Sequence, residues 1–191
     1  MTANRHHRAR TALGAAAALA FSASAAAASQ PSVKVFPGPD GASQVVQGQV
    51  DIAASPAVVW RVITDPALSA RMIVNMRSTR VLQQDPAGRW DVREQISKGG
   101  LLPGVRTVIR SDYTAPSQVR FHAVDGDIKQ LDGEWRLSPL DGGRRTHVVY
   151  ESRVTSPFPA PAPMVRSVLR GDMPRTLANL RDASEAEAAR P

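Results

Sequence analysis

Hydrophobic and polar residues alternate along most of the chain between residues 45 and 155. A period of two is typical of strands that bury one face of a sheet. The first run covers residues 45–52, and turn signals or loops separate the later runs. The later runs are 78–84, 89–97, 105–115, 118–124, 133–139 and 145–155. This pattern predicts an antiparallel sheet of six to seven strands.

Two short helices are predicted between the first and second strands. Ser55 followed by Pro56 is a helix N-cap with proline at the first helical position, where its missing N–H costs no hydrogen bond. Asp65 and Pro66 repeat this signal, so they end the first helix and begin a second one, which reaches Met72.

A long helix is predicted after the last strand. Hydrophobic residues recur at intervals of three and four from Val165 to Leu180, which is the spacing of one helix face. Gly171 and Pro174 interrupt this stretch and predict a kink or a break. The polar residues after Leu180 are expected to fray. Residues 29–44, before the first strand, are rich in proline and glycine and predict an extended lead-in.

The order of these elements predicts an α+β fold in which a curved sheet wraps around the C-terminal helix. One helix is about 10 Å wide and cannot fill a wide concave surface, so we expect a cavity between helix and sheet. The alternative is that large aromatic side chains on the inner face fill this space. Alternation predicts the same inward residues in both cases. They are Trp90, Val92, Glu94, Ile109, Ser111, Tyr113, Phe121, Trp135, Leu137, Val148, Tyr150, Ser152, Val165, Leu169 and Met173.

Residues 1–28 have the composition of an export signal. Arg5, Arg8 and Arg10 form a positive segment, a short apolar run follows, and small residues ending at Ala28 offer a cleavage site. The apolar run is about half as long as a membrane-spanning helix, so no transmembrane segment is expected in the mature chain. We therefore expect a periplasmic or secreted protein cleaved near Ala28. The alternative is a disordered, alanine-rich leader on a cytosolic protein.

The full chain has 24 basic and 17 acidic residues and a net charge of +7. The leader holds three of the basic residues and no acidic residue, so the mature chain keeps 21 basic and 17 acidic residues, a net charge of +4. The remaining arginines alternate with apolar residues, as on the wet face of a sheet, and no nucleic-acid partner is expected. The chain has no cysteine, which excludes disulfides and a thiol nucleophile.

Glu94 is the one weak candidate for a catalytic residue, because alternation places it on the inner face beside Trp90 and Val92. Burial there raises the pKa of a carboxyl, which suits a general base or a hydrogen-bond donor to a carbonyl. Tyr113 or Tyr150 would bind a ligand oxygen beside it. Alternatively, Glu94 pairs with an arginine or lies near the open edge in water, and the tyrosines bind neighbouring serines.

Neither a metal site nor a cofactor is expected. The mature chain has only two histidines, His122 and His147, and both are predicted on outward faces. The sequence also lacks the glycine-rich phosphate loop, the nucleophile elbow and the paired-histidine zinc motif.

Four stretches carry a family resemblance. They read VDIAASPAVVWRVITD at 50–65, STRVLQ at 78–83, GDIKQLDGEWRLSP at 126–139 and THVVYES at 146–152, and the last helix ends in TLANLRDASE. This ordered set resembles the START-like superfamily, also known as the SRPBCC or Bet v 1-like group. Within it, the sequence resembles the polyketide cyclase/dehydrase and coenzyme Q-binding (Coq10-like) START domains. The resemblance implies a helix-grip fold and a cavity for a lipid, an isoprenoid quinone or a polyketide.

The predicted function is therefore the binding or carrying of a hydrophobic small molecule by an exported protein. A cyclase or dehydratase that uses Glu94 and a tyrosine is the first alternative, and a non-catalytic interaction domain of the cell envelope is the second. The expected partner is a hydrophobic ligand, with transient contact to a membrane surface. The predicted organisation is a signal peptide (1–28), the lead-in (29–44), a START-like ligand-binding domain (45–185) and a disordered tail (186–191).

Overall fold

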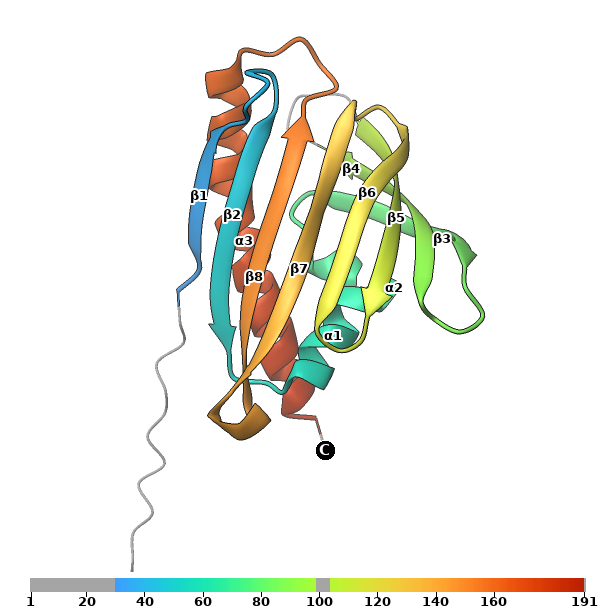
Figure 1. Ribbon diagram of the computed structural model, residues 1–191, viewed down its shortest axis with the longest axis vertical. Coiled ribbons are helices and arrows are strands. Elements are labelled where there is room, and N and C mark those ends of the chain that lie inside the picture. The colour runs from blue at the N-terminus through green and yellow to red at the C-terminus, as the bar shows by residue number, and fades with distance from the viewer. Residues whose placement is uncertain (1–29, 99–103, 191) are drawn as a thin grey trace, which may run out of the picture.

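The computed structural model describes residues 30–98 and 104–190. An eight-stranded antiparallel sheet curls around a long helix, α3 (Ala162–Ala188), with two short helices, α1 (Pro56–Thr64) and α2 (Pro66–Met72), beside it (Figure 1). The strands are β1 (Ser32–Pro37), β2 (Gln44–Ile52), β3 (Met76–Gln84), β4 (Trp90–Lys98), β5 (Gly104–Thr114), β6 (Gln118–Gly126), β7 (Gln130–Leu140) and β8 (Arg145–Thr155), with a 3-10 turn, η1 (Asp141–Gly143), before β8. This arrangement confirms the predicted α+β helix-grip fold.

The sheet has one strand more than predicted, because β1 forms inside the expected lead-in. The strand order is β1-β2-β8-β7-β6-β5-β4-β3, so β1 is an edge strand and pairs antiparallel with β2. Val35 is buried, and its carbonyl accepts a hydrogen bond from Arg170 of α3 at 3.2 Å. The alternation of Val33 and Val35 is too short, and too close to Pro37, to predict a strand without this helix.

Both predicted helix starts are confirmed. Ser55 precedes α1, whose first residue is Pro56. The carboxylate of Asp65 accepts hydrogen bonds from the backbone N–H groups of Ala67 and Leu68 at 2.8 and 2.9 Å, and so caps α2.

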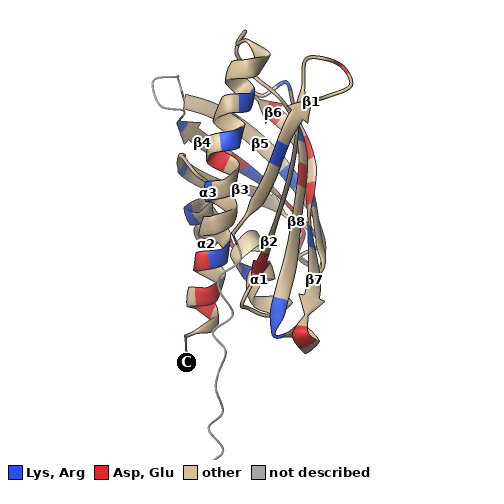
Figure 2. Cartoon of the chain, turned by 90° about the vertical axis from the view of Figure 1, so that its left-hand side faces the viewer, with Lys and Arg blue, Asp and Glu red and all other residues tan. Residues whose placement is uncertain are grey.

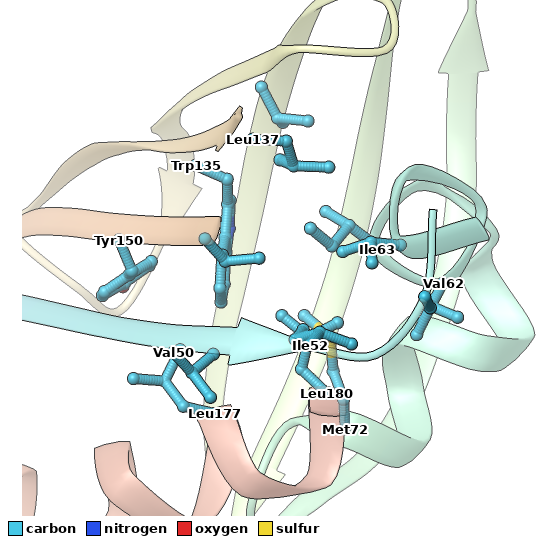
Figure 3. Packing of buried hydrophobic residues seen from close by; sticks show 14 of the residues in the cluster. Val50, Ile52, Val62, Ile63, Met72, Trp135, Leu137, Tyr150, Leu177 and Leu180 are labelled. Carbon is cyan, nitrogen blue, oxygen red and sulfur yellow. The ribbon is translucent and has the colours of Figure 1, made fainter. Parts of the chain in front are cut away.

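The inner faces of β2, β7 and β8 follow the predicted alternation. Val50 and Ile52 of β2 are almost fully buried, as is Leu137 of β7. Their side chains converge with Val62 of α1 and Leu180 of α3 (Figure 3). The core therefore lies at the end of the sheet that α1 covers.

Helix α3 is attached to the sheet mainly through its second half. Leu177 and Leu180 there are 0% exposed, whereas Met164 and Val168 in the first half are 51% and 49% exposed. Gly48 explains how close the second half comes to β2. A Cβ atom at Gly48 would lie 2.7 Å from Leu177 Cδ1, so a larger residue there would force the Leu177 side chain to shift.

The end of α3 is held more firmly than predicted. The helix continues unbroken through Gly171 and Pro174 to Ala188, so neither the expected break nor the expected fraying occurs. Glu185 accepts a hydrogen bond from the Ala53 N–H at 3.0 Å, and Glu187 forms an ion pair with Arg61 of α1. These polar residues therefore have partners just after β2 and on α1.

Charged residues of both signs are spread over the sheet and α3 instead of gathering on one element (Figure 2). This distribution agrees with the predicted dispersion of the positive charge. None of the described helices is long and apolar enough to span a membrane.

We expect Leu177→Ala to lower the free energy of unfolding by about 3 kcal/mol, because it removes a fully buried side chain and leaves a cavity against β2. Val168→Ala is the matched control in the same helix. It should change the free energy by less than about 0.5 kcal/mol, because Val168 is half exposed. Urea unfolding measures both values. Equal losses in the two variants would contradict the division of α3 into an attached and a loosely held half.

Candidate functional site

A cavity of about 210 Å³ lies between the concave face of the sheet and the helices. The helices contribute apolar side chains to its wall, namely Ile63 of α1, Met72 of α2 and Met173 of α3. Because α3 packs against β1 and β2, the space between Met173 and strands β4 to β7 is left open. The cavity therefore lies where the straight helix and the curved sheet diverge.

Three aromatic residues form the sheet side of the cavity. The rings of Phe121 and Tyr150 stack with their centroids 6.0 Å apart, and Trp135 lies 4.5 Å from Tyr150. Gly133 makes this packing possible, since a Cβ atom there would lie 2.7 Å from the Phe121 ring. Burial raises the pKa of Tyr150 to about 12, so its hydroxyl stays neutral. The wall is therefore aromatic, with the rings of Phe121 and Tyr150 nearly parallel, at 16°, and that of Trp135 tilted by 53° to Tyr150.

The opposite side of the cavity carries a buried ion pair. Arg93 and Asp91 of β4 are each 6% exposed, and Arg93 Nε donates to Asp91 Oδ2 at 2.7 Å. The Tyr113 hydroxyl donates to the same oxygen at 2.7 Å. Arg93 also donates to Ser69 Oγ at 3.3 Å and to the carbonyl of Thr64. This set of bonds lets two opposite charges remain buried next to an apolar cavity.

Arg93 keeps hydrogen-bonding capacity on the cavity side. A guanidinium has five N–H groups, and the bonds to Asp91, Ser69, Thr64 and Tyr113 engage Nε, both hydrogens of Nη2 and one hydrogen of Nη1. One Nη1 hydrogen therefore stays free for a ligand. Burial raises the pKa of the Tyr113 hydroxyl well above its ordinary value, so this group stays neutral, and its one hydrogen is donated to Asp91.

Strand β4 presents the face opposite to the one that alternation predicts. Arg93 lines the cavity, which places Trp90, Val92 and Glu94 on the outer face of the sheet. The Trp90 ring is covered there by the guanidinium of Arg110, 4.4 Å from its centroid. The prediction of an inward Glu94 is thus corrected. Tryptophan and valine suggest a buried face, but the apolar groups on this strand are covered by neighbouring side chains.

Glu94 forms an ion-pair network on the outer face. Its carboxylate accepts from Arg106 Nε at 2.8 Å and from Arg80 Nη2 at 3.0 Å. These bonds, that to Arg106 first, hold the pKa of Glu94 below its ordinary value, whereas the sequence predicted a raised pKa. The carboxylate is therefore ionised and engaged outside the cavity, which removes it as a candidate base.

The remaining predicted residues lie in or beneath the cavity. Those that line it are Ile109, Ser111, Tyr113, Phe121, Trp135, Tyr150 and Met173. Leu137 and Val148 are buried in the core below, Ser152 is buried next to Tyr150, and Val165 and Leu169 are half-buried on the first half of α3.

The sequence and the structure were compared with known protein families and solved structures. The family model described as polyketide cyclase/dehydrase and lipid transport matches residues 52–181. The chain belongs to this family. No curated protein matches the sequence. The solved structures that resemble this member share its fold at low sequence identity.

Three of these structures show how widely the fold is shared. The STAR-related lipid transfer protein of Xanthomonas axonopodis is 18% identical with a TM-score of 0.69, over 81% of this chain and 93% of that one. Human StAR-related lipid transfer protein 5 is 16% identical with a TM-score of 0.65, over 82% and 83%. The Zhui aromatase/cyclase of a Streptomyces species is 18% identical with a TM-score of 0.61, over 76% and 93%.

Sequence reasoning predicted Ser111 and Tyr113 in the cavity but missed four other polar residues. Arg93 and Gln95 line it from β4, and Ser69 and Thr176 line it from the helices. The available signal was the spacing of Asp91 and Arg93, since residues two apart share one face of a strand and can neutralise each other. Helix residues carry no comparable signal, because their position over the sheet depends on tertiary packing.

We expect Glu94→Gln to be less stable than the wild type at pH 7 and equally stable at low pH. A folded-state pKa below the ordinary value of 4.5 means that the ionised carboxylate stabilises the fold above pH 4.5. This contribution is lost as the pH falls through the folded-state pKa. Urea unfolding over a pH series measures the difference. A variant more stable than the wild type at pH 7 would instead indicate a desolvated, inward carboxylate.

Proposed function

We propose that the protein binds and carries a compact hydrophobic molecule that has an oxygen atom on one edge. The observation that supports this best is the cavity between the aromatic wall and Arg93. Ring systems of the isoprenoid quinone, polyketide or ring-bearing lipid type match this description. Their flat faces fit the stacked side chains of Phe121 and Tyr150, and their oxygen fits the guanidinium.

The volume of about 210 Å³ limits how much of the ligand lies inside. In another protein a dry cavity of about 150 Å³ holds one benzene ring, and typical small-molecule sites span about 300 to 1,000 Å³. One or two fused rings are therefore the favoured contents. A long acyl or isoprenoid tail would have to extend out of the cavity.

Arg93 favours an oxygen acceptor over a purely apolar ligand. Its free Nη1 hydrogen is shielded from water, since only 6% of the residue is exposed. A hydrogen bond from a charged donor contributes about 1.5–3 kcal/mol in proteins. An unpaired ligand carbonyl in the same place would lose its hydration without compensation. The site thus distinguishes ligands by one oxygen atom.

The position of the carboxylates favours binding over cyclase or dehydratase chemistry. No Asp or Glu is among the described residues that line the cavity. Asp91 lies behind the wall, where its Oδ2 is engaged by Arg93 and Tyr113 while its Oδ1 has no hydrogen-bond partner among the described residues, and Glu94 faces outward. A general base must reach the substrate proton, and neither carboxylate lines the cavity. Two of the similar structures are named lipid transfer proteins, which supports the carrier function.

Export is part of the proposed function. The predicted signal, residues 1–28, lies outside the described residues. Strand β1 begins at Ser32, so cleavage near Ala28 would leave the whole sheet intact. A periplasmic or secreted carrier would meet apolar molecules at the envelope, where their solubility in water is low.

In a bacterial host with a periplasm, we expect the protein in the periplasmic fraction with its N-terminus at or near Ser29. Intact mass and N-terminal sequencing identify the cleavage site. A variant with Arg5, Arg8 and Arg10 replaced by Glu should stay in the cytoplasm with its leader, because export signals need a positive start. Wild-type protein found full-length in the cytoplasm would contradict export and favour the disordered-leader alternative.

We expect the wild type to bind 2-naphthol at least about tenfold more tightly than naphthalene, because only the naphthol has an oxygen for Arg93. Arg93→Lys keeps the positive charge beside Asp91 but removes the planar fork. It should reduce the preference to about twofold and leave naphthalene binding unchanged. Titration calorimetry measures both affinities, and thermal unfolding checks that the variant is folded.

Arg110→Lys is the matched control, because Arg110 stacks on Trp90 on the outer face of the sheet. It should leave both affinities unchanged. Equal weakening of both ligands by Arg93→Lys would assign Arg93 a structural role only. A wild type that binds neither ligand, and that native mass spectrometry finds empty and indifferent to quinones and fatty acids, would support the envelope-domain alternative.

A further inference from the structure

One oxygen atom of the buried ion pair beside the cavity lacks a hydrogen-bond donor. Asp91 Oδ2 accepts hydrogen bonds from Arg93 Nε and from the Tyr113 hydroxyl, each at 2.7 Å. Asp91 Oδ1 is buried and has no hydrogen-bond partner among the residues that the structure describes. A buried carboxylate oxygen without a donor has lost its hydration uncompensated, so any donor within reach lowers the free energy by turning toward it.

The hydroxyl of Ser111 is a donor within reach of this oxygen. Ser111 of β5 is the direct cross-strand partner of Asp91 of β4, and its hydroxyl lies beside that of Tyr113, which is bonded to Asp91. Directly opposed residues have Cβ atoms about 4.5–5.5 Å apart, so rotation of the Ser111 side chain brings its hydroxyl to Asp91 Oδ1. Ser111 also lines the cavity, whereas Asp91 does not. Ser111 therefore connects the buried carboxylate to the ligand.

The bond to Asp91 fixes the hydrogen-bonding character of Ser111. A serine hydroxyl has one hydrogen and two acceptor lone pairs. Once its hydrogen is donated to Asp91, the Ser111 oxygen can only accept a hydrogen bond from the ligand. Arg93 has no acceptor atom and can only donate. Because the guanidinium of Arg93 lies against Asp91, its donor and the acceptor of Ser111 border the same part of the cavity.

Two other polar residues of the cavity wall are less suited to the same ligand atom. Gln95 lies on the opposite side of Arg93 from Asp91 along β4, and the guanidinium extends toward Asp91. Ser69 already accepts a hydrogen bond from Arg93 and donates its own hydrogen to the Pro66 carbonyl, both at 3.3 Å. The acceptor beside the free hydrogen of Arg93 is therefore assigned to Ser111.

We propose that the cavity selects a ligand whose edge oxygen is a hydroxyl, and that Ser111, turned by Asp91, is the residue that selects it. The ligand hydroxyl accepts a hydrogen bond from Arg93 and donates its hydrogen to Ser111. A carbonyl oxygen in the same place accepts from Arg93 but meets the lone pairs of Ser111, which repel it. Ring alcohols and phenols are therefore preferred over ketones and quinones. The inference rests on the proposed function, because it specifies the oxygen group of the same ligand.

Binding of 2-indanol and 2-indanone tests the inference, because these molecules share one fused-ring skeleton and differ in a hydroxyl against a carbonyl. We expect the wild type to bind 2-indanol at least about fivefold more tightly, since only the alcohol bonds both Arg93 and Ser111. Ser111→Ala should abolish this preference by weakening 2-indanol without weakening 2-indanone. Ser138→Ala, which changes an exposed serine of β7, is the matched control and should keep the preference. Titration calorimetry measures the affinities, and thermal unfolding checks that each variant is folded.

Asp91→Asn tests how the carboxylate acts through Ser111. Asparagine can keep its oxygen toward Arg93 and Tyr113 and place its amide nitrogen where Oδ1 lies. This nitrogen donates to Ser111, so the Ser111 hydrogen turns to the cavity, and the preference should shift to 2-indanone by at least about twofold. Equal weakening of both ligands would assign Asp91 a structural role and overturn its part in selection. If the variant does not fold, the result with Ser111→Ala decides the inference.

The binding results separate failure of this inference from failure of the proposed function. Equal affinities of the wild type for 2-indanol and 2-indanone, or tighter binding of 2-indanone, would overturn the inference while the binding function stands. A preference for 2-indanol that survives Ser111→Ala would overturn the role of Ser111. A wild type that binds neither of these ligands nor 2-naphthol would overturn the proposed function and the inference with it.

Discussion

The contact between Leu177 of α3 and the bare backbone at Gly48 is the constraint on which the rest of the structure depends. Because glycine has no side chain, the helix lies directly on β2 at this point. The helix packs along β1 and β2, whereas the sheet curves away from it across β7, β6, β5 and β4. The cavity beside Met173 is the space that results. One close contact thus determines both where the core is dense and where a ligand fits.

The Asp91–Arg93 ion pair differs from this apolar contact in its effect on stability. Burying two charges costs several kcal/mol per ion, and well-packed apolar residues often stabilise a protein as much or more. The pair is therefore poor at explaining stability, since Asp91 Oδ1 is buried without a hydrogen-bond partner among the described residues even though Tyr113 and Ser69 bind other atoms of the pair. It explains ligand orientation better, because it keeps a charged donor in a place that water hardly reaches. Under the proposed function, the free energy lost by burying the two charges is offset when the guanidinium of Arg93 donates a hydrogen bond to the ligand.

The strands that could be predicted from the sequence are those whose two faces differ in chemistry. On β2, Val50 and Ile52 face the core while polar residues face water, and this contrast is visible in one dimension. On β4 the contrast is reversed, since Arg93 faces the cavity and Trp90 faces outward under Arg110. The general rule that apolar residues face inward fails where the interior is a polar binding site.

The spacing of opposite charges two residues apart does not resolve this ambiguity. Asp91 and Arg93 have it on the inner face, and Arg110 and Asp112 have it on the outer face, where they also form an ion pair. Only the strand partners and the covering helices distinguish the two cases. For the same reason, Ser69 and Thr176 could not be assigned to the cavity before the helices were placed. The hydrophobic pattern of the sequence thus predicts most of the fold. The polar residues Arg93, Ser69 and Thr176 reach the cavity only through tertiary packing, which the pattern does not show.

The two halves of α3 are buried to different extents, and this difference affects how ligand binding would change the stability of the fold. A ligand that binds only the folded protein stabilises it by RT ln(1 + [L]/Kd), which is about 2.7 kcal/mol at a hundredfold excess over Kd. Leu177 and Leu180 are fully buried with or without the cavity filled, so the part of α3 that can respond lies before Pro174. The proposed carrier function sets a limit on this stabilisation, because a ligand that is held too tightly is not released.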